Sequence, residues 1–380
     1  MKSKKSDFII IIIFLLFIYG IVAGNLITKD RMFSEMENRM LAKMPDISMK
    51  EVLSGKFMEQ YETYITDQFV ARDTFIYIKS AGERIIGKKE NHGVYYGEDG
   101  YLAEQMLPFD KTQLSKNITS VKKFLEVTGA NVSFALIPGS LEINRDKMPA
   151  VIPDVNQNEV IRNIYQELEG LNVTCVDVCK TLLEHKEEEL FYRTDHHWTS
   201  RGAYYGYQSL FNSKKEEIIP ISEYEEVVQS DCFYGTLFSK TGAFWLAPDT
   251  ISTYVAETGI EVERVDGNGV IKGELYDESW LEKKDKYSMF LGGNQPLAII
   301  RTKQEELPKL LVIRDSYFDS MAPFLTAHYS EIHVVDFRYN RANVEEYMKE
   351  NEIEEVLIVY SLANFVEDKN IGYVLGNVTK

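Results

Sequence analysis

The uncharged run from Phe8 to Thr28 restricts the fold of this chain more than any other segment. It contains no proline and is followed by Lys29 and Asp30. As a helix rising ~1.5 Å per residue it would span about 31 Å, which matches the hydrocarbon core of a bilayer. The part from Ile9 to Phe17 is apolar on every side, so a soluble protein would have to bury it completely. We therefore predict that residues 1–28 form a membrane anchor.

The residues around this run predict its orientation. Lys2, Lys4 and Lys5 precede it, and positive residues tend to stay on the cytoplasmic side. The N-terminus would then be cytoplasmic, and the main domain of this single-pass cell-membrane protein would be extracytoplasmic. A cleaved signal peptide is the alternative, because the small residues Ala23 and Gly24 close the run. The run is longer than the ~7–15 apolar residues of a signal peptide, which favours an uncleaved anchor.

Charge and cysteine content argue against two classes of protein. Asp and Glu number 59 against 42 Lys and Arg, a net charge of −17, which argues against nucleic acid as the main partner. The three cysteines, Cys175, Cys179 and Cys232, are too few for a disulfide scaffold. Without a nearby histidine they also make a poor zinc site. We expect them to fill the core.

The chain after the anchor divides into two predicted parts. Apolar residues recur at helical spacing through residues 29–90, interrupted by Pro45 and Gly55, which predicts a helical stalk or packing arm. Residues 91–380 are expected to form the main domain. This domain opens with Asn91–Leu102, where β-formers alternate with turn residues as in a hairpin.

The main domain has the pattern of an α/β fold. Short apolar runs predict buried strands at Val132–Pro138, Val173–Val178, Leu310–Arg314, Ile332–Phe337 and Val356–Tyr360. Helical patterns lie between them at Asn156–Leu168, Phe318–Tyr329 and Asn343–Asn351. This alternation predicts a doubly wound, mainly parallel sheet with both faces covered. Residues from about 215 to 300 differ, because aromatic and β-branched residues alternate there with Gly and Asp-Gly turns, and we predict a β-rich insertion.

Ligands of an open parallel sheet bind beyond the carboxyl ends of its strands. Three such ends carry polar residues: Asp315-Ser316-Tyr317, Arg338-Tyr339-Asn340, and the segment from Ser361 to Asn364. Ser316 stands at a strand-to-helix turn, where its hydroxyl would be exposed and helix amides could face an oxyanion.

A serine hydroxyl needs a base to become a strong nucleophile. The segment Asp195-His196-His197-Trp198 supplies an imidazole with a carboxylate close enough to orient it. Ser316, His197 and Asp195 therefore have the makings of a catalytic triad.

Each of these residues also has a structural explanation. A serine after a strand is often a helix N-cap, and a His next to Asp is commonly a satisfied pair. Asp195, His196 and His197 could also belong to a zinc or iron site. No further ligand at an obvious spacing accompanies them. We therefore expect neither a metal nor a cofactor.

The segment TDHHWTSRGAYYGY closely resembles the signature of the bacterial DHHW family, which is similar to the alginate O-acetylation proteins of the SGNH-hydrolase-like group. FSEMENRMLAKMP, DQFVARD, GVYYGEDGYL, FYGTLFSKTG and VIRDSYFDSMAPFL resemble other family segments in the expected order. The resemblance implies an extracytoplasmic O-acyltransferase or esterase acting on a polysaccharide. It also implies a permuted SGNH-like order, in which the Asp-x-His pair precedes the serine.

Position by position, the resemblance puts the nucleophile at Ser316, the base at His197 and the orienting carboxylate at Asp195. His196 would be the variable residue between them, although the two histidines could exchange roles. Trp198 is a candidate substrate contact, because an aromatic ring can stack on a sugar, but it could equally be a core residue. Phe233, Tyr234, Phe244 and Trp245 could stack in the same way or belong to the core.

Further candidates lie at the other strand ends. Asn364 could match the asparagine of the SGNH oxyanion hole, although SLANF lacks the usual Gly-x-Asn-Asp context. Arg338 and Tyr339 are candidate substrate contacts or solvated strand ends. The chain carries Asp315 where the parent group has a glycine before the serine, which puts the turn geometry and the second oxyanion donor in question.

The function expected from these residues is O-acetyl transfer to a cell-surface or secreted polysaccharide through an acyl-enzyme. The same triad could instead hydrolyse acetyl esters of a polysaccharide, or the domain could be a non-catalytic glycan-binding assembly module. Acetyl-CoA is cytoplasmic, so transfer outside the membrane would require a partner that supplies acetyl groups. A multispanning membrane acyltransferase is the expected partner.

Overall fold

The computed structural model describes residues 3–255, 259–266, 269–341 and 343–375. The chain divides into two compact units, one made of Met1–Lys88 with Ser239–Trp245 and the other of Lys89–Phe238 with Leu246–Lys380.

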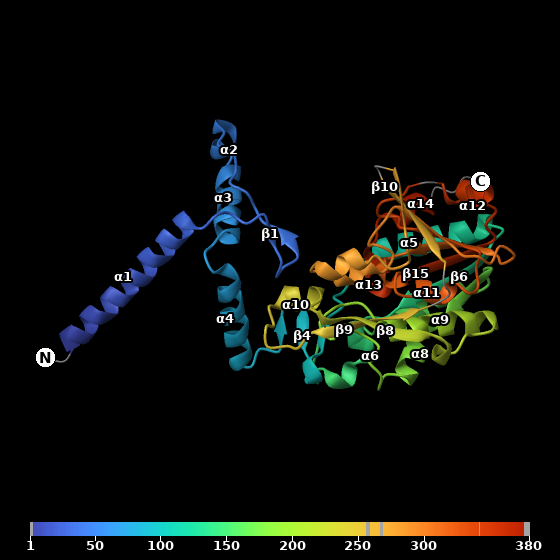
Figure 1. The fold of residues 1–380 in the computed structure, drawn as a ribbon, viewed down its shortest axis with the longest axis horizontal. Coiled ribbons are helices and arrows are strands. Elements are labelled where there is room, and N and C mark those ends of the chain that lie inside the picture. The colour runs from blue at the N-terminus through green and yellow to red at the C-terminus, as the bar shows by residue number, and fades with distance from the viewer. Residues whose placement is uncertain (1–2, 256–258, 267–268, 342, 376–380) are drawn as a thin grey trace. The chain divides into compact units, whose positions relative to one another are not determined.

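The first unit begins with helix α1 (Ser3–Ile27), dark blue in Figure 1. Its stretch Ser6–Ile27 has a mean hydropathy of 2.7 and is long and apolar enough to cross a membrane. An exposed apolar helix of this length at the N-terminus fits either a membrane anchor or a signal sequence.

The rest of the first unit is helical, apart from the short strands β1 (Phe33–Ser34) and β2 (Arg39–Met40). The helices are α2 (Met49–Leu53), α3 (Lys56–Asp67) and α4 (Arg72–Ile85). Gly55 separates α2 from α3 at a positive φ of 79°, which a residue with a Cβ rarely adopts. The buried carboxylate of Asp67 accepts hydrogen bonds from Arg39 at 2.5 and 2.9 Å and from the amide of Ala42, which connects α3 to β2.

The second unit contains an eight-stranded sheet, with strand order β11-β10-β12-β14-β13-β15-β6-β7 among the described residues. Its strands are β6 (Asn131–Ile137), β7 (Val173–Val176), β10 (Glu261–Asp266), β11 (Gly269–Gly273), β12 (Leu297–Arg301), β13 (Lys309–Arg314), β14 (Glu331–Val335) and β15 (Glu355–Ser361). The stretch from β14 to β7 is parallel. The five parallel strands are those expected from the apolar runs, and the fold is mixed α/β with a large, mostly parallel sheet.

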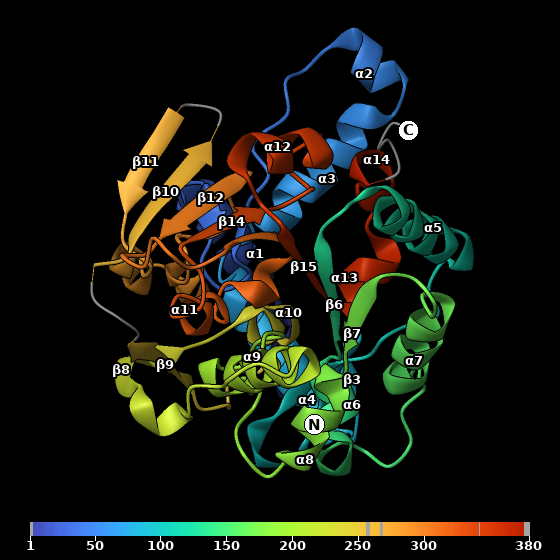
Figure 2. The ribbon, with the colours of Figure 1, turned by 90° about the vertical axis from the view of Figure 1, so that its right-hand side faces the viewer.

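Helices cover both faces of this sheet. One core cluster packs four helices against side chains such as Val312 and Leu357: α6 (Ser140–Ile143), α8 (Val178–Glu184), α9 (Ser200–Lys214) and α11 (Ala322–Leu325). The other packs five helices against Ile313 and Ile358: α5 (Lys111–Val127), α7 (Gln157–Glu167), α12 (Val344–Asn351), α13 (Leu362–Glu367) and α14 (Ile371–Val374). Figure 2 shows α5 and α7 on one side of β6 and β7, with α9 and α11 on the other. Successive residues of a strand point to opposite faces, so continuous apolar strands feed both clusters.

The second unit also contains the start of helix α10 (Thr236–Thr241), which ends in the first unit. The long helix expected at Phe318–Tyr329 was wrong. A 3-10 turn, Ser316–Phe318, and the short α11 stand there instead. Pro323 has no N–H to continue a preceding helix, which explains the break.

The segment expected to be a β-rich insertion is rich in strands. β8 (Glu225–Phe233) and β9 (Asp249–Val255) pair as a separate antiparallel ribbon. β10, β11 and β12 instead extend the main sheet, because β12 pairs antiparallel with β14. The insertion therefore covers an edge of the sheet that would otherwise be unpaired.

The hairpin expected near Asn91 is present and gains a third strand. β3 (Glu90–Asn91), β4 (Val94–Tyr96) and β5 (Leu102–Glu104) form an antiparallel meander. The amide of Leu102 donates 2.8 Å to the carbonyl of Arg193, which attaches the meander to the loop that carries the DHHW motif.

The expectation that all cysteines fill the core was partly wrong. Cys179 is fully buried, Cys175 is half-buried and Cys232 is exposed on β8, and all three are free thiols. The strand register explains the difference, because most residues of β8 lie outside the core.

Candidate active site

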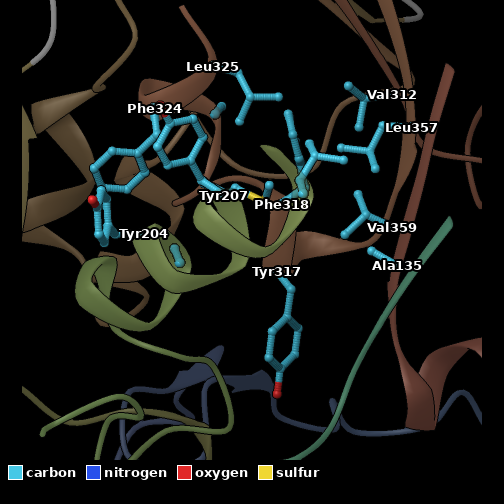
Figure 3. Close-up of a cluster of buried hydrophobic side chains, with 14 of the residues drawn as sticks. Ala135, Tyr204, Tyr207, Val312, Tyr317, Phe318, Phe324, Leu325, Leu357 and Val359 are labelled. Atoms are coloured by element: carbon cyan, nitrogen blue, oxygen red, sulfur yellow. The ribbon is translucent and has the colours of Figure 1, made fainter. Parts of the chain in front are cut away.

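Ser316 follows β13 and begins the 3-10 turn, as expected from its place after an apolar run. It is partly exposed, although Asp315 and Tyr317 on either side of it are buried. Tyr317 and Phe318 belong to one buried cluster, and Figure 3 shows the ring of Tyr317 directed away from Phe318. The sequence therefore anchors the turn on apolar residues and leaves the hydroxyl of Ser316 accessible.

Asp315 holds this turn without needing a glycine. Its φ of −106° lies in the extended region that any residue adopts. One carboxylate oxygen accepts from the amide of Tyr317 at 3.1 Å. The other accepts from the amide and hydroxyl of Ser361 at 2.8 and 2.7 Å and from Asn364 Nδ2 at 2.7 Å. Asp315 thus ties the end of β13 to the end of β15, and it occupies the Tyr317 amide that could have served an oxyanion.

The loop before α9 carries the DHHW residues and is held in place by hydrogen bonds to Asp249. The buried carboxylate of Asp249 accepts from the amide and hydroxyl of Thr194, at 2.8 and 2.5 Å, and from the amide of Arg193 at 2.9 Å. Burial raises the pKa of Asp249, and these hydrogen bonds oppose the shift. Asp249 stands at the start of β9, and nothing in its sequence context marks it for this role.

The two distant segments meet at the carboxyl end of the sheet. His197 Nε2 lies 2.8 Å from Ser316 Oγ, although the residues are 119 positions apart. His197 Nδ1 lies 2.6 Å from Asp195 Oδ1. An imidazole that donates from Nδ1 to a carboxylate has Nε2 free to accept a proton from the serine. The geometry can therefore support nucleophilic chemistry at Ser316.

The carboxylate of Asp195 is buried and fully hydrogen-bonded. Besides His197, it accepts from the amide and hydroxyl of Thr236 at 2.7 and 2.9 Å. Burial alone would raise the pKa of Asp195, but the neighbouring imidazoles of His196 and His197 and these hydrogen bonds hold it well below its usual range. Asp195 is therefore ionised at neutral pH, as an orienting group must be.

Thr236 and the preceding Gly235 belong to the segment FYGTLFSKTG, in which the sequence indicated only the aromatic residues Phe233 and Tyr234 as site candidates. A Cβ on Gly235 would lie 2.2 Å from the Cβ of Asp195, so only glycine fits there. The sequence offered one signal of this role, a glycine followed by a hydroxyl residue. Its significance becomes clear only when the fold brings Asp195 next to it.

His196 lies beside the triad and faces outward. Its side chain is 37% exposed, and its Nδ1 lies 2.7 Å from the hydroxyl of Thr236. Desolvation and the charge of His197 lower the pKa of His196. His196 therefore faces solvent, whereas His197 contacts Ser316.

Trp198 is not a surface platform for sugar, contrary to the expectation that it contacts substrate. The indole is fully buried, and its Nε1 donates to the carbonyl of Tyr317 at 2.9 Å and to Ser320 Oγ at 3.0 Å. A Cβ on Gly206 of α9 would lie 2.5 Å from the indole ring. An indole N–H must find an acceptor when buried, and here it joins the DHHW loop to the serine turn.

The other aromatic candidates divide between the two units. Phe233 is buried in the core of the second unit, while Tyr234 of the same segment is half-buried. Phe244 and Trp245 belong to the first unit, where Phe244 packs on Tyr77 and Arg84 lies over the ring of Trp245.

Asn364 and Arg338 line a cavity of about 300 Å³ together with Asp315. Asn364 is exposed, with one amide hydrogen used by Asp315. Arg338 is paired with Asp336 at 2.6 Å and donates to Asn294 at 3.1 Å. Tyr339 is 56% exposed at the same strand end.

The metal-site alternative has a structural counterpart. Asp195, His196 and His197 each offer a ligand atom, and these atoms lie within 4.8 Å of one another in the described part of the chain. The carboxylate and both Nδ1 atoms already have hydrogen-bond partners in Thr236 and in one another. Hydrogen bonding therefore accounts for the arrangement of these side chains.

A model of the DHHW protein family matches residues 105–335, more than half of the chain. A DHHW family protein from Eubacterium siraeum DSM 15702 has a similar structure, with a TM-score of 0.62 at 23% identity over 77% of this chain and 98% of its own. PatB1 of Bacillus cereus, in a structure with a sulfonyl adduct, gives 0.61 at 20% identity over 74% and 97%. The O-acetyltransferase domain of Pseudomonas putida AlgJ is less similar, at 0.47 and 14% over 73% and 93%. The search of curated proteins gave no match. The resemblance inferred from the DHHW segment is thereby confirmed, and the chain belongs to the DHHW family.

Proposed function

We propose that this chain is an extracytoplasmic O-acetyltransferase acting on a cell-surface or secreted polysaccharide. Ser316 is the nucleophile, His197 the base and Asp195 the carboxylate that orients the base. The hydrogen-bonded series from Ser316 through His197 to Asp195, at 2.8 and 2.6 Å, carries this proposal. The DHHW family membership and its likeness to acetylation proteins support an acetyl group as the one transferred.

The first half of the reaction forms an acyl-enzyme. Ser316 Oγ attacks the acetyl carbonyl carbon while its proton passes to His197 Nε2. The tetrahedral adduct collapses, the bond to the donor breaks, and the leaving group takes the proton from His197. Such base assistance contributes about 10²–10⁴-fold to the rate.

The second half reverses these transfers. A sugar hydroxyl gives its proton to His197 and attacks the acetyl carbonyl, and Ser316 leaves with the proton returned by the imidazole. Asn364, with one amide hydrogen still available, is our candidate donor to the oxyanion. An oxyanion donor contributes about 3–4 kcal/mol. Arg338, Tyr339 and the exposed face of His196 are the proposed substrate contacts.

The permuted SGNH-like arrangement is part of this proposal. Asp195 and His197 precede the serine in the chain, whereas in ordinary SGNH hydrolases the corresponding pair closes it. The three residues nevertheless converge at the carboxyl end of a mostly parallel sheet, where ligands of such sheets bind.

The test uses the full-length chain in detergent with p-nitrophenyl acetate as donor and a panel of oligosaccharides as acceptors. Acetylated oligosaccharide is measured by mass spectrometry. Ser316→Ala should lose all measurable transfer and keep the wild-type thermal unfolding profile. Ser115→Ala, an exposed serine of α5, is the matched control and should keep full activity. Transfer that persists in the Ser316→Ala variant would remove the nucleophile from this mechanism.

A sulfonyl fluoride gives an independent readout of the same hydroxyl. Ser316 Oγ would form a bond to sulfur, fluoride would leave, and the proton would pass to His197. The sulfonyl adduct in the PatB1 structure makes this reagent class the suitable probe. If the wild-type chain gains no adduct at Ser316 but binds glycan, the domain is a non-catalytic glycan-binding module.

Acetyl-ester hydrolysis is the second candidate function. Ser316 is partly exposed and His196 faces outward, so water can approach an acyl-enzyme as a sugar does. Acetate release measured with and without oligosaccharide separates the two activities. A transferase diverts acetyl groups from water to the acceptor, whereas an esterase releases acetate at the same rate in both.

The proposed location and organisation follow from helix α1. Residues 1–28 anchor the chain with a cytoplasmic N-terminus, residues 29–90 form the stalk, and residues 91–380 form the extracytoplasmic SGNH-like domain, with a β-rich insertion at about 215–300. A multispanning membrane acyltransferase would supply the acetyl groups. Protease treatment of intact spheroplasts tests the topology, because the main domain should be digested while an N-terminal tag stays protected.

A further inference from the structure

We propose that Tyr287 is a positioning residue of the active site, which fixes the ring of His197 and the backbone of Ser316 at the same time. This inference rests on the proposed function. It also gives the β-rich segment a role, since Tyr287 lies in its 3-10 turn Lys286–Met289.

The ring of Tyr287 stacks on the imidazole of His197. The two centroids are 3.8 Å apart and the planes differ by 7°. His196 covers the other face of the imidazole, at 3.8 Å and 37°. The bond to Asp195 restrains the His197 ring within its own plane, while the parallel ring of Tyr287 and the inclined ring of His196 oppose tilting. Tyr287 is 4% exposed, so its position is itself fixed by packing.

The hydroxyl of Tyr287 contacts the serine turn. It donates to the carbonyl of Ser316 at 3.1 Å and lies 3.0 Å from Ser320 Oγ. Ser320 Oγ also accepts from the indole of Trp198. Burial raises the pKa of Tyr287 well above its ordinary value, so the hydroxyl keeps its proton and remains a donor. One side chain therefore connects the base, the nucleophile's backbone and the DHHW tryptophan.

This arrangement matters most when His197 carries the serine proton. The face of an aromatic ring attracts a cation, so the stacked Tyr287 interacts more strongly with the imidazolium of the transition state than with the neutral imidazole. A small displacement of a catalytic group costs up to about 10²-fold in rate. Losing the ring should therefore reduce kcat, whereas sugar binding should be unaffected.

Two substitutions separate the ring from the hydroxyl. Tyr287→Leu removes the stack, and we expect kcat to fall about 10²-fold with KM unchanged, because near-attack geometry is lost. Tyr287→Phe keeps the stack and removes only the hydroxyl, and it should restore the rate to within about 5-fold of wild type. Modification by phenylmethylsulfonyl fluoride should slow in parallel, since it depends on the same base.

Tyr276→Phe is the matched control. Tyr276 lies in the same segment and its hydroxyl donates 3.0 Å to the carbonyl of Tyr254, without a bond to His197 or Ser316. It should retain wild-type kcat and sulfonylation rate. If Tyr287→Leu does not fold, Tyr287→Met fills the same space without an aromatic face and should show the same loss.

The outcomes distinguish this inference from the proposed function. A folded Tyr287→Leu or Tyr287→Met variant with wild-type kcat overturns the positioning role. If both variants fail to fold, Tyr287→Phe tests the contribution of the hydroxyl. Unchanged kcat and sulfonylation rate overturn that contribution, whereas a drop in kcat of up to about 5-fold with unchanged KM supports it. Activity or sulfonylation that survives Ser316→Ala overturns the proposed function itself.

Discussion

Two buried aspartates near Ser316 have pKa values shifted in opposite directions because their partners differ. Asp195 is 2% exposed and Asp319 is 3% exposed. Asp195 accepts hydrogen bonds from His197 and Thr236 on both oxygens, and its pKa lies well below the usual range. Burial raises the pKa of Asp319 to about 8, since Arg314 at 3.1 Å offsets it only partly. At equal burial, the pKa of one carboxyl is therefore lowered and that of the other is raised, according to the donors around each.

The charge of Arg314 offsets the burial of Asp319 only partly, because the same guanidinium has a second carboxylate partner. Its guanidinium also lies 3.5 Å from Asp336, which Arg338 contacts as well. Asp319 Oδ1 has no hydrogen bond of good geometry among the described residues. A shared cation compensates a buried carboxylate less well than several dedicated donors do. The hydrogen bonds around Asp195 therefore favour a negative charge beside His197. The contacts among Arg314, Asp319 and Asp336 instead stabilise the fold next to the serine turn.

We expect the largest effect from replacing the carboxylate of Asp195. Asp195→Asn should lower kcat by about 10⁴-fold, because the amide no longer holds His197 in the required tautomer. Acetyl transfer to an oligosaccharide measures it, with Asp146→Asn, an exposed aspartate paired with Lys186, as control. A rate within tenfold of wild type would contradict the triad.

The next effect should appear in stability when the shared cation is removed. Arg314→Met leaves Asp336 without one of its cations and should cost about 3–5 kcal/mol of unfolding free energy. Lys349→Met removes an exposed pair with Glu345 and should cost no more than about 1 kcal/mol. Denaturant unfolding gives the free energy of unfolding of both variants. Equal losses would show that burying an ion pair does not increase its contribution to stability.

A smaller loss is expected when the backbone beside Asp195 is crowded. Gly235→Ala introduces a Cβ 2.2 Å from the Cβ of Asp195, so the carboxylate must shift. We expect kcat to fall about 10²-fold because the triad is displaced. Gly82→Ala, whose Cβ would meet nothing within 4 Å, is the control, and kinetics with a chromogenic acetyl ester compare the two. Full activity in Gly235→Ala would mean that the loop can relax freely.

The smallest effect concerns the pH dependence of stability. The folded pKa of Asp319, about 8, exceeds its unfolded value, so the folded state binds more protons and the contribution of Asp319 to stability falls as pH rises from about 4 to 8. Asp195, with its lowered pKa, contributes in the opposite sense and loses its contribution as pH falls below about 4. Asp319→Asn should make the free energy of unfolding less dependent on pH between pH 5 and 8, because the amide does not titrate. Unfolding free energies of the variant and wild type between pH 5 and 8 with the same slope would disprove the raised pKa.

The sequence was sufficient for the parallel strands and for the candidate triad, because both depend on local patterns. Apolar runs marked β6, β7, β13, β14 and β15, and the strand-end rule directed attention to Ser316. The supports of the triad were not predictable in this way. Asp249, Thr236 and Tyr287 come from segments without clear periodicity, and only folding brings them to the DHHW loop.

Trp198 illustrates why a residue type alone misleads. An aromatic next to a candidate histidine suggested a sugar platform, but its indole N–H has acceptors inside the protein at Tyr317 and Ser320. Composition could not indicate that Gly206, about two turns into α9, leaves room for the ring. The position of such a side chain depends on the partner segment, which lies far away in the chain.

The hydrogen bonds from Ser361 and Asn364 to Asp315 also determine when the serine turn can form during synthesis. A growing polypeptide emerges with His197 long before Ser316, and the residues that brace the serine turn follow later still. A nascent chain that has not yet reached position 364 cannot complete this bracing. The hydroxyl of Ser316 therefore reaches its braced position only after residue 364 has been synthesised, long after the imidazole of His197 has emerged.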